Sequence, residues 1–321
     1  MNLRAITQSE AAAYDDLARQ HGTLFNRMDW ITLFGQQMKA FGLFDDGGTM
    51  IGGMSLYQER RWGLRILRRA PFTPTCGPFI AIKSQNPVAV LEERRQTLEC
   101  MVDYLENESP AICMLPLDRQ VVDALPFIWH EYKVIPNYTY LLDLSTPVEL
   151  IKKKMAPIRR NDISKGVRDG LIVKRTNEMG VVRNLVLATF GRQKKFVDKD
   201  VLDAILFQYA QKDNSFAYTT YRGEKAISTC FVVHDDKTAY YLLGGYCAEE
   251  RHHGAGPVAV FEAIQHSQRI GLKTFDFEGS VIPPIERYFR GFGGQLTPYF
   301  TVNKAWLPLE LGLKLIRRGV F

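Results

Sequence analysis

The order of β-rich and helical segments occurs twice along the 321 residues, and this repetition limits the fold more than any other feature. In the second half, residues 215–222, 226–234 and 238–243 are rich in aromatic and β-branched residues and are separated by short polar turns. This pattern predicts an antiparallel meander. A helix is predicted from Pro257 to about Ile270, followed by a short strand at 274–277.

The first half repeats this order more loosely. Residues 40–44 and 49–57 are predicted strands around the hairpin turn Asp45–Gly48. Residues 88–105 carry apolar side chains at three- and four-residue spacing, which predicts a helix, and 111–115 is a predicted strand after it. The repeat indicates two similar mixed α/β halves.

We place the boundary between the halves near Ser145. The sequence Thr146-Pro147-Val148-Glu149 has the form of a capping box with proline at the first helical position. Helices are predicted at about 147–155, 181–193 and 199–211, the last with Asp198 as its N-cap. A chain of this length also favours two cores, so we expect domains at 1–145 and 146–304.

Composition points to a globular protein of a reducing compartment. Hydrophobic residues make up 46% and charged residues 24% of the chain. The five cysteines form no C-x-x-C pair and match no zinc-ligand spacing, so we expect reduced thiols and no metal site. The first residues lack an apolar signal region and no long apolar run is present, so we expect a cytoplasmic protein without a transmembrane segment.

A glycine pattern joins the second meander to its helix. Arg251-His252-His253-Gly254-Ala255-Gly256 has the form R-x-x-G-x-G between a predicted strand and a predicted helix. The unpaired first amides of a helix, with its dipole, suit a pyrophosphate group. The alternative is a loop before a helix that binds nothing.

Basic residues gather in two stretches. Residues 151–175 contain nine Lys or Arg and two Asp, and residues 59–69 contain five Arg and one Glu around Trp62. Such stretches suit a nucleotide, a coenzyme, the acceptor end of a tRNA or an anionic lipid surface. The alternative is a solvated helix face without a partner.

Four segments together resemble one family. Residues 275–280 read Phe-Asp-Phe-Glu-Gly-Ser, and residues 288–294 read Tyr-Phe-Arg-Gly-Phe-Gly-Gly. Residues 158–170 form a basic segment that ends in Arg-Asp-Gly, and residues 26–30 end in Trp30. These segments are similar to motifs of the Fem-type aminoacyltransferases and of related GNAT-like acyltransferases that act on cell-envelope polymers.

The resemblance implies a fold and an activity. The fold would be α/β, with two tandem GNAT-like domains, mixed and mostly antiparallel sheets, and residues 305–321 packing back on the first domain. The activity would be transfer of an acyl group from acyl-CoA or aminoacyl-tRNA to an amine or hydroxyl, with no tightly bound cofactor. A cell-envelope precursor, or another anionic or phosphate-bearing molecule, would be the acceptor.

The chain departs from the family at two places. Phe289 stands three residues before the Phe of the Phe-Gly-Gly sequence, where the family often has Lys. Ile31, Thr32 and Phe34 follow Trp30, where members that use nucleotide-linked precursors carry Lys. Both differences weaken the inference that this chain acts on a peptidoglycan precursor. They leave the acyl-transfer class intact.

Candidate site residues follow from these motifs. Acyl transfer needs a base for the acceptor, and we assign this role to Glu278, at the expected end of a strand. Tyr288 and Tyr246 are further candidates for proton transfer. Glu278 could instead pair with Arg287 or Arg290 for structural reasons. The residues expected to bind the donor are Arg251, Gly254, Ala255 and Gly256. Those expected to bind the acceptor are Trp30, Lys194, Lys195, Arg287 and Arg290.

Two other classes of function stay open. One is a GNAT-like module without activity that binds RNA or an anionic polymer. The other is a peripheral membrane protein, since one predicted helical face near residue 310 is apolar and has Lys314, Arg317 and Arg318 beside it. Packing of that face on the protein itself is the alternative. The apolar residues are Trp306, Leu309, Leu313, Ile316 and Val320.

Overall fold

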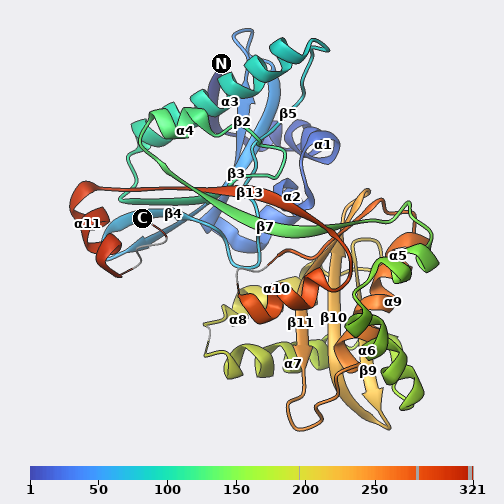
Figure 1. Ribbon diagram of the computed structural model, residues 1–321. Helices are drawn as coiled ribbons and strands as arrows, with labels where there is room; N and C mark the ends of the chain where they lie inside the picture. Colours follow the sequence, from blue (N-terminus) through green and yellow to red (C-terminus); the bar gives the residue numbers. More distant parts are fainter. Residues whose placement is uncertain (195, 280–281, 317–319, 321) are drawn as a thin grey trace. The chain divides into compact units, whose positions relative to one another are not determined.

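The computed structural model describes residues 1–194, 196–279, 282–316 and 320. The chain forms two compact units, one of residues 1–137 and 298–321 and one of residues 138–297 (Figure 1). It passes from one unit to the other within β7 (Lys133–Asp143) and β13 (Gln295–Ala305). The domains predicted from the sequence, 1–145 and 146–304, stay a prediction, because a compact unit is not yet shown to fold alone.

The sheet of the first unit has the strand order β1-β2-β3-β4-β6-β13. Neighbouring strands are antiparallel except β4 and β6, which are parallel, and β5 pairs separately with β3. The strands are β1 (Asn2–Ala5), β2 (Met38–Phe44), β3 (Met50–Arg61), β4 (Leu64–Arg68), β5 (Phe79–Ile80) and β6 (Ile112–Pro116).

The sheet of the second unit has the order β8-β9-β10-β11-β12-β7. Its neighbours are again antiparallel with one exception, the parallel pair β11 and β12. The strands are β8 (Ile172–Thr176), β9 (Ser215–Arg222), β10 (Lys225–His234), β11 (Thr238–Tyr246) and β12 (Thr274–Asp276).

The two sheets therefore repeat one pattern strand by strand, with the parallel pair at the same place. The predicted fold class, tandem mixed α/β units with mostly antiparallel sheets, is confirmed. The structure adds strands that the sequence pattern did not predict, among them β4, whose five residues include two arginines. It completes the first meander, because β4 corresponds to β11.

Helices flank each sheet. In the second unit they include a π-helical turn at Ile205–Tyr209, which continues α8. The α-helices of this unit are α5 (Val148–Lys154), α6 (Pro157–Arg168), α7 (Met179–Arg192), α8 (Lys199–Ala204), α9 (Ala255–Arg269) and α10 (Pro283–Arg290). Those of the first unit are α1 (Ala11–His21), α2 (Met28–Ile31), α3 (Pro87–Glu108), α4 (Leu125–Trp129) and α11 (Leu307–Ile316).

Two helix starts differ from the prediction. Helix α9 begins at Ala255, so Pro257 is its third residue rather than its first. The capping box at Thr146 is wrong, because α5 begins after Pro147 and the Thr146 hydroxyl lies 3.4 Å from Asp143 Oδ2. Asp198 is confirmed as an N-cap, since its Oδ1 accepts the Val201 N–H at 3.1 Å.

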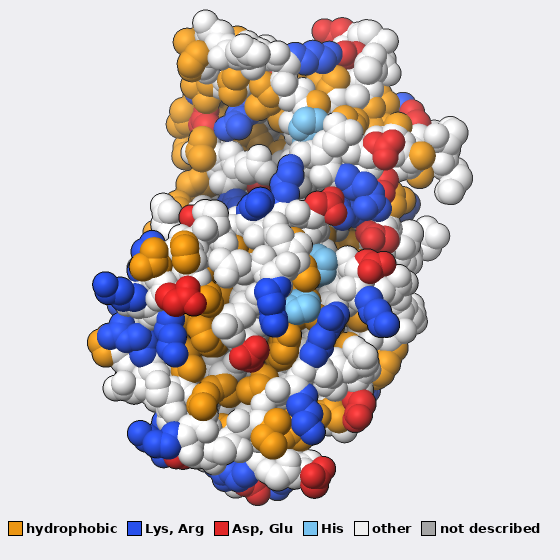
Figure 2. Space-filling view, turned by 90° about the vertical axis from the view of Figure 1, so that its right-hand side faces the viewer, with side chains coloured by type: hydrophobic (Ala, Val, Ile, Leu, Met, Phe, Trp, Pro, Cys, Tyr) orange, Lys and Arg blue, Asp and Glu red, His pale blue; other side chains and the backbone are white. Residues whose placement is uncertain are grey.

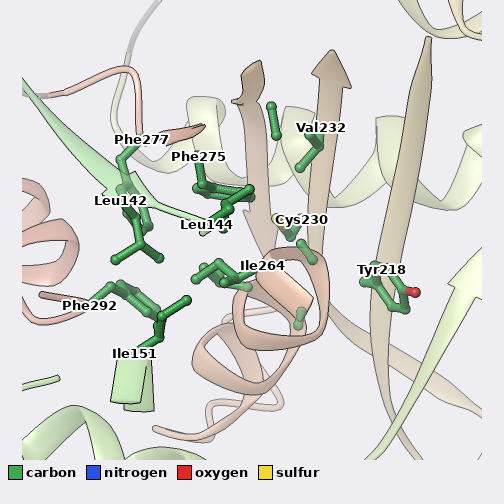
Figure 3. Close-up of a cluster of buried hydrophobic side chains, with 14 of the residues drawn as sticks. Leu142, Leu144, Ile151, Tyr218, Cys230, Val232, Ile264, Phe275, Phe277 and Phe292 are labelled. Atoms are coloured by element: carbon green, nitrogen blue, oxygen red, sulfur yellow. The ribbon is translucent and has the colours of Figure 1, made fainter. Parts of the chain in front are cut away.

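The core of the second unit fixes the end of β12. Phe275 and Phe277 are fully buried, and Phe277 stacks on Phe292 with ring centroids 5.3 Å apart. Leu142 of β7 and Ile264 of α9 belong to the same cluster (Figure 3). Because the aromatic residues on both sides of Asp276 are anchored in this core, the chain leaves the sheet at a defined point.

Helix α11 is apolar on more than one face. Leu309 and Leu313 of the predicted face are partly buried, whereas Trp306 is exposed. The leucines at 307, 311 and 315 are also exposed. Ile316 is in the helix, and the predicted basic positions 317 and 318 lie outside the described residues. Among the helices that the structure describes, none is long and apolar enough to cross a membrane.

Candidate active site

The second unit contains a cavity of about 680 Å³. Its walls are the end of α7, the second half of β11, the loop from Cys247 to His253, the first turn of α9, residues 277–279 and one face of α10. All of these residues belong to the second unit. The cavity is of the size that small-molecule sites in proteins usually have.

The cavity opens where β11 and β12 separate. Strand β12 pairs with β11 only from Thr238 to Tyr240, and its last residue is Asp276. Strand β11 continues to Tyr246 with β10 as its neighbour. One edge of β11 therefore extends past its parallel partner, and the second half of this strand forms a cavity wall.

A bulge in β11 turns a tyrosine toward this wall. Phe231 pairs with Leu243 and Val232 with Tyr241, so Leu242 is the additional residue. Tyr241 and Gly244 consequently face the same side, and a Cβ atom at Gly244 would lie 2.3 Å from Tyr241 Oη. Gly244 leaves room for this hydroxyl, and burial raises the pKa of Tyr241. Tyr241 was not among the site residues predicted from the sequence.

Glu278 also lines the cavity, and its backbone conformation is unusual. Its φ is +59°, in the left-handed region that non-glycine residues rarely adopt. Its N–H donates to Asp276 Oδ1 at 2.9 Å, and the Thr139 hydroxyl donates to the same oxygen at 2.5 Å. Asp276 is 4% exposed, so this turn is held from inside the protein. Such backbone strain clusters at functional sites.

The next residue confirms how tightly the turn is fixed. Gly279 also has a left-handed φ, +61°, and a Cβ atom there would lie 1.9 Å from the carbonyl oxygen of Tyr138. Only glycine fits this position without displacing β7. The sequence Glu278-Gly279 is thus a specific turn, and both of its residues line the cavity.

Tyr288 reaches the cavity from α10. This helix lines the cavity with Pro284, Ile285, Tyr288 and Phe289. A Cβ atom at Gly256 would lie 2.9 Å from Tyr288 Oη, so the hydroxyl lies beside the first turn of α9. Burial raises the pKa of Tyr288, and the Arg159 guanidinium, 4.2 Å from the ring centroid, opposes this effect.

The two arginines predicted to bind the acceptor lie on other faces of α10. Arg287 and Arg290 are exposed and do not line the cavity. Arg290 pairs with Glu286 at 3.3 Å, and Glu286 also accepts a hydrogen bond from Tyr140 at 2.5 Å. A role for these arginines in acceptor binding stays a prediction, and it would require an acceptor that extends beyond the cavity.

The glycine loop contributes Arg251, Ala255 and Gly256 to the cavity wall. Gly254 has a different reason to be glycine. A Cβ atom there would lie 2.5 Å from the Asp162 carbonyl oxygen and 2.8 Å from Gly166 Cα. Its close approach is therefore to the backbone of α6, and it does not line the cavity. Tyr246, at the other end of the loop, is 45% exposed with Arg192 stacked on its ring.

Most N–H groups at the start of α9 already have acceptors. The Gly254 N–H donates to His252 Nδ1 at 3.0 Å, and the Ala255 N–H donates to the His252 carbonyl at 3.1 Å. Pro257 has no N–H. Within the first turn, Gly256 has the one N–H without a protein acceptor among the described residues. The expectation that several first-turn amides are available to a phosphate is therefore wrong.

His252 connects this loop to α6. Its side chain is 8% exposed, and its Nε2 lies 3.0 Å from Asp169 Oδ2. Lys165 also pairs with Asp169, whose pKa falls to about 2 because of Lys165 first and His252 second. Asp169 belongs to the Arg-Asp-Gly sequence at the end of the basic segment. The two motifs singled out in the sequence therefore meet in the structure.

The remaining predicted acceptor residues do not line the cavity. Trp30 belongs to the first unit, is 0% exposed, and donates its indole N–H to Thr73 Oγ1 at 3.0 Å. The prediction that Trp30 contacts a substrate is wrong, because a fully buried side chain is a core residue. Lys194 is exposed beside the cavity residue Gln193. Lys195 lies outside the described residues.

The basic stretches are partly neutralised. Arg65 pairs with Glu108 and Arg68 with Glu59. Arg159 is 7% exposed and bonded to Asp162 at 3.0 Å, so it is an interior residue rather than part of a basic surface. On the side of the molecule where α5 and α6 lie, Lys and Arg side chains are spread with Asp and Glu between them (Figure 2).

Comparison with known proteins gives one family match, in the second unit. Residues 175–290 match the family of acetyltransferase (GNAT) domains. This segment lies in the second unit and contains most of the cavity wall. The matched segment thus resembles GNAT acyltransferases, as the sequence resemblance implied. No curated protein gives a significant match.

Solved structures show the same fold along nearly the whole chain. The structure is similar to FemX, with a TM-score of 0.67 and 12% identity over 98% of this chain and 100% of FemX. It is also similar to the C-terminal domain of a putative lysylphosphatidylglycerol synthetase from Agrobacterium fabrum (TM-score 0.58, 12% identity, 95% of each chain). The predicted Fem-type fold is thereby confirmed.

Proposed function

We propose that this chain transfers an acyl or aminoacyl group from a bound donor to an amine or hydroxyl of a small acceptor, and that the reaction takes place in the cavity of the second unit. One observation carries the proposal. Glu278 and Tyr288 line one cavity within the segment that matches a GNAT domain, where β11 extends beyond β12.

The proposed reaction needs no covalent enzyme intermediate. The acceptor nitrogen or oxygen attacks the donor carbonyl carbon, and Glu278 takes the proton that the acceptor loses, directly or through water. The bond from this carbon to the donor sulfur or ester oxygen then breaks. The leaving group takes a proton, and the Tyr288 hydroxyl is our candidate for its donor. Solvent then removes the proton from Glu278 and returns one to Tyr288.

The acidity of Tyr288 relates to the chemistry of the donor. Burial raises its pKa, so the phenol stays protonated and can donate at neutral pH. A thiolate leaving group has a conjugate acid with a pKa of about 8.5 and needs little help from so weak an acid. An alkoxide from an ester is far more basic and gains from protonation. Tyr288 is therefore expected to matter more with an aminoacyl ester than with a thioester.

The donor would lie along the open edge of β11 and reach the loop Arg251–Gly256. The free Gly256 N–H, the Arg251 side chain and the dipole of α9 favour a negatively charged group there. Acyl-CoA and aminoacyl-tRNA both carry phosphate at a distance from the reacting carbonyl. An aminoacyl ester is among the candidate donors because four segments of the sequence resemble motifs of the Fem-type aminoacyltransferases.

Donor binding and turnover test the proposal. The purified chain is titrated with acetyl-CoA, longer acyl-CoAs and aminoacyl-tRNAs by calorimetry, and transfer to a panel of amines and hydroxyls is followed by mass spectrometry. We expect one donor class to bind and react. A Gly256→Val variant should weaken that binding, because the new side chain points at Tyr288 Oη. Gly191→Ala is the control, since nothing lies within 4 Å of its Cβ position.

The proposal fails if no donor class binds, or if Gly256→Val binds the donor as tightly as the wild type. Gly254→Val is not a suitable test, because it would displace the backbone of α6 whether or not a ligand is present. Binding of RNA without any transfer would instead favour a non-catalytic GNAT-like module.

A further inference from the structure

We propose that His252 is a positioning residue of the donor site, which holds the loop of the cavity wall by bonding to Gly254 on one side and to Asp169 on the other. The functional part of this inference rests on the proposed function, because it takes the cavity as the donor site. The structural part stands on contacts within the second unit alone.

The hydrogen bonds fix the tautomer of the imidazole. Nδ1 accepts the Gly254 N–H at 3.0 Å, so this nitrogen carries no proton. The ring proton is then on Nε2, which donates to Asp169 Oδ2 at 3.0 Å. Since Lys165 keeps Asp169 ionised, the second bond is charge-assisted.

The contact with Gly254 sets the path of the chain into α9. A side-chain acceptor that binds the N–H two residues later forms a turn of the kind that Asn and Asp make. The His252 carbonyl accepts the next N–H, from Ala255, so one residue satisfies two N–H groups at the start of the helix. The same residue also lines the cavity.

The contact with Asp169 ties this turn to α6. Gly254 and Gly166 pack so closely that a Cβ atom at Gly254 would lie 2.8 Å from the Gly166 nitrogen. The start of α9 is also held on the sheet, where the Thr220 hydroxyl donates to the Ala255 carbonyl at 2.8 Å. The contact with Asp169 adds a charge-assisted bond from the loop itself to the end of α6. His252 therefore joins the donor loop to the rigid part of the unit.

Other ionisable groups near His252 and Asp169 do not replace the hydrogen bond between these two residues. Lys165 pairs with Asp169 from the side of α6, and Arg168 Nε lies 4.0 Å from Asp169 Oδ1. Arg251 and His253 are neighbours along the chain and line the cavity.

Three variants separate the two bonds. In His252→Asn the amide oxygen occupies the place of Nδ1 and keeps the Gly254 bond but cannot reach Asp169. In His252→Gln the amide nitrogen occupies the place of Nε2 and keeps the Asp169 bond. His252→Leu removes both. His130→Leu in the first unit is the control, because His130 also contacts a carboxylate, Glu106 at 3.2 Å.

The first readout does not depend on activity. In protein labelled with ¹⁵N at histidine, NMR at pH 7.5 should show His252 as the Nε2–H tautomer. Amide hydrogen exchange at Gly254 and Ala255 should be at least about tenfold faster in His252→Leu, the effect of one lost buried hydrogen bond. The Nδ1–H tautomer, or unchanged exchange in His252→Leu, would overturn the inference.

The second readout is kinetic. The KM for the donor should rise about tenfold or more in His252→Leu, and less in the Asn and Gln variants, with a smaller change in kcat. An unchanged donor KM in an active His252→Leu variant would refute the role in donor positioning. If the wild type transfers no acyl group while the NMR and exchange results hold, the proposed function fails and the loop contact remains established.

Discussion

The two units share one strand order, yet they differ just beyond their parallel strand pair. In the second unit, β11 runs on past β12 and a cavity opens between them. In the first unit, β4 pairs with β6 as far as its last residue, Arg68. The chain that follows β4 then returns alongside, because the Cys76 N–H donates to the Pro116 carbonyl and the Cys76 carbonyl accepts the Ser55 N–H, each at 2.9 Å.

The first unit therefore fills with its own backbone the place that is open in the second. Asp118 N–H donates to the Gly77 carbonyl at 2.7 Å, which completes the closure. Cys76 is buried there, with its thiol on the Pro116 carbonyl, as expected for a structural rather than a nucleophilic cysteine. The comparison teaches that strand topology alone does not provide a site. What decides whether a cavity exists is how far β4 or β11 extends past its parallel partner, and the path of the chain that follows this strand.

The acidic residues near the ends of β6 and β12 also differ between the two units. Asp118 is 5% exposed, and its Oδ1 accepts the Gln120 N–H at 2.9 Å. Asp276 makes the corresponding bond, to the Glu278 N–H, in the second unit. There the second carboxylate, Glu278, follows on the cavity wall. One acid shapes the turn in each unit, but the residue whose N–H it binds is Gln120 in the first unit and Glu278, which lines the cavity of about 680 Å³, in the second.

The largest expected effect separates these acids. Glu278→Gln should lower turnover by about 10²–10⁴-fold while donor binding is retained, because the amide cannot accept the proton. Asp118→Asn, which keeps the oxygen that accepts the Gln120 N–H, should leave turnover unchanged. Steady-state rates and calorimetry measure both. If Glu278→Gln keeps full turnover from pH 6 to 9, the base is another group, and Tyr288 and Tyr246 are the next to test.

A second difference concerns two glycines with left-handed φ. Gly279→Ala should destabilise the second unit by clearly more than the roughly 1 kcal/mol that a left-handed alanine costs, because its Cβ would meet the Tyr138 carbonyl at 1.9 Å. Gly63→Ala in the first unit has the same φ penalty and nothing within 4 Å. Equal losses of stability in urea titrations followed by circular dichroism would contradict the described turn.

A third effect concerns the proton donor. Tyr288→Phe should lower turnover about tenfold or more with an aminoacyl ester and only slightly with a thioester, because the basicity of the leaving group differs. Tyr57→Phe in the first unit, whose hydroxyl lies 3.3 Å from Gln37, is the control for loss of a tyrosine hydroxyl. Equal effects with both donor types would show that Tyr288 binds or orients the donor rather than protonating the leaving group.

Local patterns predicted the second unit better than the first. Strands 215–222 and 226–234 alternate aromatic and β-branched residues, and they are β9 and most of β10 in the structure. The segment that became β4 reads Leu-Arg-Ile-Leu-Arg and drew attention as a cluster of charge instead. Its arginines gain partners only when β3 and α3 are in place, which a local pattern does not contain.

The site was predicted where its residues are close in the sequence and missed where they are distant. Glu278, Tyr288 and the loop at 251–256 were identified from motifs, and all of them except Gly254 line one cavity together with Tyr241. The importance of His252 depends on Asp169, 83 residues away. Trp30 was misassigned because an aromatic residue in a motif does not reveal whether its ring is buried.

The smallest expected effect is a dependence of stability on pH in the second unit. His266 of α9 packs edge to face on Phe216 of β9 at 4.5 Å, and at the corresponding place of the first unit Tyr104 of α3 contacts Phe41 of β2. Burial, and then the charges of Arg175 and Arg269, lower the pKa of His266 from 6.5 to about 4. The unfolded chain therefore binds more protons than the folded unit between these values.

The stabilising contribution of neutral His266 should thus be complete above about pH 6.5 and should be lost as the pH falls toward 4. His266→Gln should remove this part of the pH dependence, because glutamine does not titrate. All four tryptophans, at 30, 62, 129 and 306, lie in the first unit, so fluorescence follows that unit alone and circular dichroism follows both. Urea titrations at pH 4.5 and 7 measure the stability of the wild type and of the variant. We expect their pH dependence to differ when unfolding is followed by circular dichroism. Where the first unit unfolds in a transition of its own, seen by fluorescence, we expect that transition to be the same in both proteins. A wild type and a His266→Gln variant that lose the same stability on acidification would show that other groups, and not this histidine, set the pH response of the second unit.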